Sequence, residues 1–290
     1  MRRLLTLLCV LICSGWALPA GADGLPAPAR RIVTLDWGVA ETLVALGAPP
    51  AGVPDIRGYA DWVADPPLPA GTVNLGSRFE PNLELIRSLK PDLIILIPFQ
   101  SGLEPLLRRI APTLTLSVHQ GVGQPYAAAQ EATRTLGRLT GREAEAEALI
   151  TRTETILSDS RARFAVAPPP PVLVSAVADA HHLWVFGQGS LYGDLLGRLG
   201  LRNGWTEPVS DWGFSAVGAD RLAEAGDSTF VTLRPLPPDY ETGLTQSPLW
   251  QALPFVQAGR VTVLPPVLMF GMLPSSARFA TLLADALVPR

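Results

Sequence analysis

Cysteine is almost absent from this chain, and its position excludes several kinds of chemistry. The two cysteines, Cys9 and Cys13, both lie within residues 1–22, a segment with the features of an export signal. A mature chain that begins near Asp23 would contain no cysteine. Disulfide bonds, thiol catalysis and cysteine-ligated metals are therefore excluded for the mature protein.

Lysine and histidine are also scarce. Lys90 is the only lysine, the formal net charge is −3, and no stripe of basic residues occurs, so nucleic-acid binding has little support. Two of the 3 histidines, His181 and His182, are adjacent. Neighbouring side chains point to opposite faces of a strand, so we interpret this pair as a solvated edge and not as metal ligands.

The amino-terminal segment predicts export. Arg2 and Arg3 precede an apolar run over residues 4–12, and the small residues 20–22 follow at the distance expected of a cleavage site. The apolar run is shorter than the ~20 residues that a membrane-spanning helix needs, which disfavours an amino-terminal anchor. We therefore expect residues 1–22 to be a signal peptide, cleaved near Ala22, and the mature protein to be periplasmic.

The most informative stretch covers residues 59–97. We interpret its first part as an aromatic loop, residues 72–75 as a short strand, and Arg78 as a lone arginine on a turn. Apolar residues recur at helical spacing from Leu83 to Leu89, with Pro81 in the first turn, and Pro91 prevents the helix from continuing. Residues 93–97 are entirely apolar, which is typical of a parallel strand covered by helices on both faces.

The polar and aromatic residues of this stretch follow the predicted strands. Trp62, Arg78 and the loop of Phe99 and Gln100 should lie just beyond the carboxyl ends of strands, where open α/β sheets bind ligands. An arginine among tryptophans at such an edge suggests a pocket for a bulky, oxygen-rich small molecule.

The chain reads as two α/β lobes joined by one helix. A strand, a turn and a helix over residues 31–46 have a counterpart over residues 183–199, and the helix and strand over residues 81–97 have one over residues 218–233. Between these halves, residues 142–166 are rich in helix formers and would extend roughly 35 Å. We therefore predict an amino-terminal lobe (30–141), a connecting helix (142–166), a carboxy-terminal lobe (170–290), and a cleft between the lobes that closes only slightly.

Several motifs together resemble a known family. The stretches RIVTLDWGVAETLVALG, YADWVADPPLPAGTVNLGSRFEPNLELIRSLKPDL, RRIAP, LWVFGQGSLYGDLL, DWGFSAVGADRLA and PLWQALPFVQAGRV occur in the order of the helical-backbone class of ABC-transporter substrate-binding proteins. They are most similar to the periplasmic ferric-hydroxamate (ferrichrome-type) siderophore-binding proteins. The resemblance implies a shallow ligand site between two α/β lobes, a monomer without enzymatic activity, and delivery of the ligand to an inner-membrane ABC permease.

The resemblance also implies the site residues. In that family an arginine contacts the hydroxamate oxygens, and Arg78 occupies its position. A family tyrosine that hydrogen-bonds the ligand corresponds to Gln100, or to Phe99 with a different gap, and a tryptophan and a tyrosine near the last long loop correspond to Leu268 and Phe270. The remaining candidates match pocket tryptophans or neighbour them: Trp37, Trp62, Trp212, Phe214 and Ser215. We expect Trp184 and Trp250, which lie in periodic apolar segments, to belong to the core.

The charge pattern favours a hydroxamate ligand within this family. A ferric tris-hydroxamate is nearly neutral and its iron is already bound by six oxygens, so the protein needs no metal ligands and no cofactor of its own. One guanidinium can donate several hydrogen bonds to the hydroxamate oxygens. A triply anionic catecholate complex would need several cations, and the motif loops clearly offer only Arg78. The alternatives are a cobalamin or haem receptor of the same fold, and an exported α/β ferric-siderophore reductase.

The same class presents an acidic residue on each lobe to arginines of the permease. Glu104, after the predicted strand 93–97, and Glu241, at the matching place in the second half, are the candidates for this docking role.

Overall fold

The computed structural model describes residues 28–179 and 181–288, so the expected signal peptide lies outside the described residues. The first half contains a parallel sheet of five strands in the order β3-β2-β1-β4-β5. Its strands are β1 (Ile32–Thr34), β2 (Gly52–Val53), β3 (Val73–Asn74), β4 (Leu93–Leu96) and β5 (Thr113–Thr115). The short helices α1 (Trp37–Ala45), α2 (Ile56–Trp62), α3 (Leu83–Ser88) and α4 (Glu104–Leu107) connect them, with a 3-10 turn over Pro98–Leu103.

The second half contains a mixed sheet in the order β10-β9-β6-β7-β8. Its strands are β6 (Val172–Val177), β7 (His182–Phe186), β8 (Phe214–Gly218), β9 (Thr229–Leu233) and β10 (Val261–Leu264). Helix α7 (Leu191–Arg198), the short helices α8 (Pro248–Gln251) and α9 (Pro254–Gln257), a 3-10 turn (Ala219–Ala225) and a π-helical turn (Tyr240–Leu244) complete this half. One parallel and one mixed sheet, connected by helices, confirm the predicted α/β class.

The two sheets are not simple copies of each other. The predicted counterpart of β1 is β7, but β1 is parallel to both of its neighbours whereas β7 is antiparallel to β6 and β8. Only residues 178–181 connect β6 to β7, and a connection this short can close a hairpin but cannot form the crossover that parallel strands require. The strand and the helix of the expected repeat are present in both halves, but the strand of the second half runs antiparallel to its neighbours.

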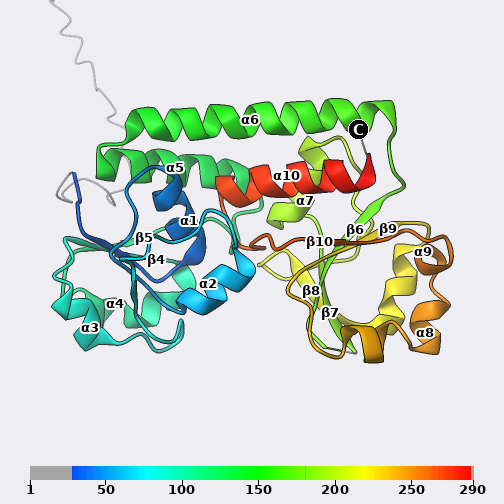
Figure 1. Ribbon diagram of the computed structural model, residues 1–290, viewed down its shortest axis with the longest axis horizontal. Coiled ribbons are helices and arrows are strands. Elements are labelled where there is room, and N and C mark those ends of the chain that lie inside the picture. The colour runs from blue at the N-terminus through cyan, green and yellow to red at the C-terminus, as the bar shows by residue number, and fades with distance from the viewer. Residues whose placement is uncertain (1–27, 180, 289–290) are drawn as a thin grey trace, which may run out of the picture.

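Three long helices cover both sheets. Helix α6 (Glu143–Val166) extends over both halves of the molecule, beside α5 (Pro125–Thr140) and α10 (Leu273–Leu287) (Figure 1). Arg163 of α6 donates to Asp285 of α10 at 2.7 Å. The predicted connecting helix corresponds to α6; the division of the chain into lobes at residues 141 and 170 remains our interpretation.

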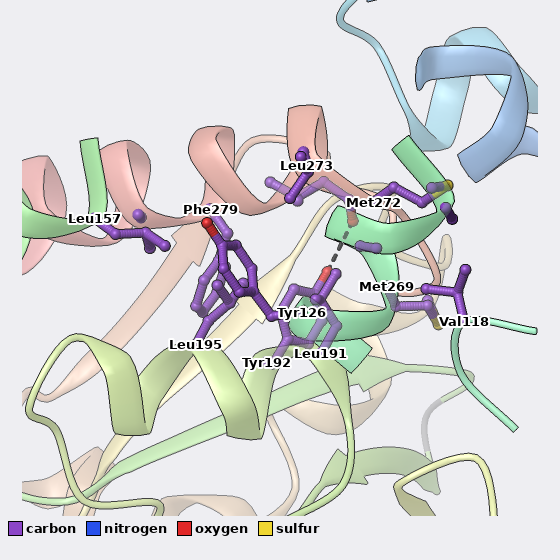
Figure 2. Packing of buried hydrophobic residues seen from close by; sticks show 14 of the residues in the cluster. Val118, Tyr126, Leu157, Leu191, Tyr192, Leu195, Met269, Met272, Leu273 and Phe279 are labelled. Atoms are coloured by element: carbon purple, nitrogen blue, oxygen red, sulfur yellow. Dashed lines mark hydrogen bonds between the residues drawn. The ribbon is translucent and has the colours of Figure 1, made fainter. Parts of the chain in front are cut away.

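One hydrophobic core extends from the first half into the second. Figure 2 shows side chains of α5, α6, α7 and α10 converging, among them Tyr126, Leu157, Tyr192 and Phe279. The Tyr192 hydroxyl donates to the Val267 carbonyl at 2.9 Å in the same region. Because close-packed interiors resist sliding, this shared core holds the two sheets at a fixed separation.

The motif stretch folds largely as its sequence predicts, with one correction. Asn82 caps α3 by accepting a hydrogen bond from the Leu85 amide at 2.9 Å, and β4 is fully buried. The start of the stretch is helical, because Asp55 caps α2 through the Gly58 amide at 3.0 Å. The expectation of an aromatic loop is therefore wrong for residues 59–62.

None of the helices within residues 28–179 and 181–288 is both long and apolar enough to cross a membrane.

Candidate ligand-binding site

A pocket of about 270 Å³ lies where the two halves meet. The first half contributes residues that follow β1, β3, β4 and β5, and the second contributes β7, β8 and the loops before β8 and α10. Its lining is Asp36, Arg78, Phe79, Ile97, Phe99, Gln100, His119, Trp184, Trp212, Phe214 and Phe270. The pocket thus lies beyond the carboxyl ends of the first sheet's strands, as predicted.

A larger groove, of about 1450 Å³, lies wholly on the second half around residues 168–171 and 200–209. We place the site in the smaller pocket because both halves form it, because aromatic rings line it, and because two buried polar atoms without partners lie in its walls. Such a combination of apolar walls with a few convergent polar groups is typical of small-molecule sites.

Arg78 brings the pocket's positive charge. It stands on the turn after β3, and its guanidinium carbon lies 3.9 Å from the centre of the Trp37 ring. The Trp37 indole is fixed from behind, since its Nε1 donates to the Pro54 carbonyl at 3.0 Å. The Nε atom of Arg78 is buried and has no hydrogen-bond partner in the described part of the chain. Trp37 therefore holds the guanidinium while leaving a donor unused.

Asp36 is the carboxylate of the pocket. It caps α1 by accepting a hydrogen bond from the Val39 amide at 2.9 Å. Burial raises its pKa above the ordinary value of 3.8, and the nearby Arg78 charge and the amides of α1 act in the opposite direction. Among the described residues that line the pocket, Arg78 is the only arginine or lysine and Asp36 the only acid.

Aromatic rings from both halves meet across the pocket. Phe99 of the first half packs edge-on against Trp212 of the second, with ring centres 6.3 Å apart, and Trp212 packs against Phe270 at 5.3 Å. Phe214 stacks on Trp184 at 4.9 Å. At the rim, Phe99 is 57% exposed and Phe79, beside it, is 71% exposed. Exposed rings of this size at a pocket mouth provide apolar surface for a ligand that projects outwards.

Gln100 shapes the wall of the pocket, but its amide is already used. Its Nε2 donates to the Leu35 carbonyl at 2.8 Å, and its Oε1 accepts from the Ile97 amide at 3.3 Å. These two contacts fix the orientation of the amide and leave one N–H of Nε2 and one lone pair of Oε1 for other partners.

The structure brings most of the predicted site residues together and separates others from the pocket. Arg78, Phe99, Gln100, Trp212, Phe214 and Phe270 line it. Trp37 lies beneath Arg78, whereas Leu268 is buried beside Trp37 and Trp62 packs against the same cluster. Ser215 donates to the Pro208 carbonyl at 2.9 Å and does not line the pocket. Strand residues alternate between faces, so Phe214 and Ser215 point in opposite directions.

Sequence reasoning missed other lining residues, chiefly His119, Phe79 and Trp184. His119 follows β5, so the rule that ligands gather beyond strand ends could have indicated it. Trp184 was expected in the core, but it is half-buried and its ring lines the pocket. Trp250, by contrast, is buried in the core as expected.

His119 is neutral at physiological pH. Burial lowers its pKa from 6.5 to about 4, although backbone groups of Phe270 and Gly271 act in the opposite direction. Its Nε2 is buried without a hydrogen-bond partner among the described residues. Within residues 28–179 and 181–288, no group of three or more His, Cys, Asp or Glu side chains could hold a metal ion.

The two docking candidates differ in their surroundings. Glu104 accepts hydrogen bonds from Arg108 Nη2 at 2.8 Å and from Thr113 Oγ1 at 3.0 Å, and Arg108 lowers its pKa below the ordinary value of 4.5. Glu241 is exposed in the π-helical turn Tyr240–Leu244.

Two α/β halves, a rigid helical bridge and a ring-lined pocket between them define the class of substrate-binding proteins. The chain belongs to the periplasmic binding protein family, whose model matches residues 32–268. This membership confirms the resemblance seen in the sequence motifs.

Individual relatives cover most of the chain. The iron(3+)-hydroxamate-binding protein FhuD of Escherichia coli is 34% identical over 89% of this chain and 87% of its own length. The achromobactin-binding periplasmic protein of Dickeya dadantii is 31% identical over 87% and 83%. The crystal structure of the Fe3+-Desferal-bound siderophore-binding protein FhuD from Vibrio cholerae superposes with a TM-score of 0.85, at 30% identity over 90% of this chain and 98% of that one.

Proposed function

We propose that this protein captures a ferric hydroxamate siderophore in the periplasm and delivers it to an inner-membrane ABC permease. The relatives support a ferric siderophore as the ligand, because those named for an iron(3+)-hydroxamate and for achromobactin both cover most of the chain. The observation that carries the choice of a hydroxamate is Arg78, the only arginine or lysine among the described lining residues, which is half-buried among aromatic rings and has a buried Nε without a partner.

The charge of the pocket supports a nearly neutral ligand. Arg78 faces Asp36, and His119 adds no positive charge at neutral pH. A strongly anionic chelate would meet one cation and one acid, whereas a neutral tris-hydroxamate needs donors for its oxygens and apolar surface for its chains.

The size of the pocket supports a shallow mode of binding. Its volume of about 270 Å³ is below the ~300–1,000 Å³ of typical ligand pockets, so a siderophore would extend beyond it. The exposed rings of Phe79 and Phe99 would then cover the projecting part. A half-buried aromatic ring contributes about 2–3 kcal/mol, so several rings together supply most of a micromolar affinity.

The protein acts in this proposal as a periplasmic monomer that binds without chemistry. Export rests on residues 1–22 and on the periplasmic relatives. Docking to the permease is assigned to Glu104 and Glu241; Glu104 would exchange its contact with Arg108 for an arginine of the permease.

A titration of tryptophan fluorescence tests the proposal. Ferrioxamine B, ferrichrome, ferric achromobactin, a ferric catecholate, haem and cobalamin are added in turn, and iron-free siderophore serves as the control. We expect saturable quenching by the ferric hydroxamates at micromolar or lower concentrations. Haem is included because His119 supplies a residue type that haem receptors use. Tighter binding of haem, cobalamin or the catecholate would reject the proposed ligand class.

A further inference from the structure

The second unused polar atom of the pocket belongs to His119. This residue lies between β5 and α5 and lines the pocket together with Arg78. Its ring packs edge-on against Phe270, with centres 5.7 Å apart. The Nε2 atom is buried, and no described residue pairs with it. Native proteins rarely leave a buried polar atom unpaired, so such an atom in a pocket wall indicates a partner that arrives from outside.

Two other polar side chains of the pocket, Gln100 and Asp36, differ from His119 because they already have hydrogen-bond partners within the protein. Both ends of the Gln100 amide bond the backbone, and Asp36 is engaged with the amides at the start of α1. Apart from Arg78 and His119, the remaining lining residues are apolar except for Trp184 and Trp212, whose indole N–H groups can donate but not accept. Arg78 Nε can only donate a hydrogen bond. An acceptor oxygen of the ligand therefore pairs with Arg78. His119 is then available for a different hydrogen bond to the ligand.

The surroundings of His119 indicate which function this is. Burial keeps the imidazole neutral, and a neutral imidazole has one donor and one acceptor nitrogen. The backbone groups of Phe270 and Gly271 favour the protonated ring, so they act as acceptors for it. Because Nε2 has no hydrogen-bond partner among the described residues, we assign these groups, and with them the proton, to the Nδ1 side of the ring. The Nε2 atom is then the acceptor.

Building on the proposed function, we propose that His119 is a second polar contact to the siderophore, accepting a hydrogen bond at Nε2 from an N–H or O–H group of the chelate. Arg78 donates to the hydroxamate oxygens around the iron, and His119 receives a donor from the connecting chain. The pair of contacts selects ferric hydroxamates whose backbone carries amide or ammonium donors beside the iron centre.

Two chelates and three variants test this proposal. Ferrioxamine B carries amide and ammonium N–H groups, whereas ferric tris(N-methylacetohydroxamate) has the same iron coordination without any N–H or O–H. The variants are His119→Phe, which keeps a ring against Phe270 but removes the acceptor, His119→Gln, which keeps an acceptor, and the exposed control His182→Gln.

We expect His119→Phe to weaken ferrioxamine B binding about tenfold, the loss of one hydrogen bond, and to leave the donor-free chelate unaffected. His119→Gln should restore most of the affinity, and His182→Gln should bind both chelates as the wild type does. Near-ultraviolet circular dichroism checks that each variant retains its tertiary packing.

Unchanged binding of ferrioxamine B by His119→Phe overturns the proposal, and so does an equal loss for both chelates, which would mean a structural role or donation from Nε2 to the hydroxamate oxygens. Failure of the wild type to bind either chelate would instead reject the proposed function itself. If His119→Phe does not fold, ¹⁵N-histidine NMR of the wild type with the gallium complex of desferrioxamine B decides: the Nε2 resonance of His119 should shift on binding, and an unshifted resonance contradicts the contact.

Discussion

Arg78 and Trp37 form a unit in which the ring orients the charge. The guanidinium carbon lies over the ring of an indole that is itself hydrogen-bonded to the Pro54 carbonyl, and this arrangement needs no salt bridge. Cation–π contact and a planar fork suit Arg for this position better than Lys. We inferred the ligand class from this one arginine. The inference has a physical basis, because Asp36 is the only other described lining residue that carries a charge.

Arg78→Ala should weaken binding of a ferric hydroxamate about thirtyfold, because a hydrogen bond from a charged group contributes about 2 kcal/mol. Arg87→Ala, at an exposed position of α3, is the matched control and should bind as the wild type does. Isothermal titration calorimetry measures both affinities. Equal affinities for Arg78→Ala and the wild type would remove Arg78 from the site.

The sequence predicted pocket residues well where their neighbours are turn formers. It predicted them poorly where they lie within strands or helices. Arg78 and Trp212 stand on loops, and both line the pocket. Trp184 lies in an apolar segment that looked like core, yet strand alternation turns one face of β7 towards the pocket. His119 gave no motif signal, because its role depends on burial by Phe270, which is distant in sequence.

At the scale of elements, Glu41 connects helix α1 to the start of helix α10. This buried residue of α1 accepts hydrogen bonds from the Met272 amide and the Ser275 hydroxyl, both at 2.6 Å, at the start of α10. A carboxyl at a helix amino terminus satisfies amides that lack partners within the helix. Burial nevertheless raises the Glu41 pKa from 4.5 to about 7.

This shift predicts a pH dependence of stability. Between pH 4.5 and 7 the folded protein keeps a proton on Glu41 that the unfolded chain has released, so the free energy of unfolding falls as pH rises. The full effect would be roughly 3 kcal/mol. Glu41→Gln, which cannot ionise, should therefore gain stability relative to the wild type as pH rises from 5 to 8. Urea unfolding of both proteins measures the difference.

The comparison with Glu41→Gln is essential to that experiment, because the titration of His119 changes the free energy of unfolding in the opposite direction. Its lowered pKa adds stability above pH 6.5 that is lost towards pH 4. Since both proteins retain His119, its contribution cancels in the difference. Parallel pH profiles for Glu41→Gln and the wild type would show that Glu41 is not the responsible group.

The loop that carries Trp212 depends on Gly213. This glycine has a φ of +78°, and an added Cβ would overlap the backbone of Ser190 and Gly189. Gly213→Ala should lower the free energy of unfolding by about 2 kcal/mol or more and weaken ligand binding by displacing Trp212. Gly197→Ala in α7, where an added Cβ meets nothing within 4 Å, is the control and should not destabilise. Thermal unfolding compares the two, and a Gly213→Ala protein as stable as the control would contradict this reading.

Element types followed from periodicity, capping residues and prolines, but strand directions did not. The α3–β4 segment formed as predicted because Asn82 and Pro91 bound the helix in any context. The direction of β7 depends on the length of its connection to β6, and the helix at Ile56–Trp62 depends on the Asp55 cap. Neither constraint is visible in the spacing of apolar residues alone.

At the scale of the molecule, a shared core joins the two halves. Side chains of α5, α6, α7 and α10 pack into one cluster beneath the long helix (Figures 1 and 2). Opening the halves widely would separate these side chains, and exposing apolar surface costs about 25 cal/mol per Å². The structure therefore favours a cleft that changes little when the ligand arrives.

Small-angle X-ray scattering should give the same radius of gyration with and without a saturating ferric hydroxamate, within experimental error. The rigid helical bridge is the reason, since hinge closure needs connections that bend. A clear decrease on binding would show that the halves close like a hinge.

The most direct test of the account is the position of the iron in a crystal of the protein with ferrioxamine B. Anomalous scattering at the iron edge locates the metal without assumptions about the chelate. The account predicts one iron peak between the halves, above the pocket lined by Arg78, Trp212 and Phe270. An iron peak in the groove around residues 168–171, with the pocket between the halves empty, would contradict it.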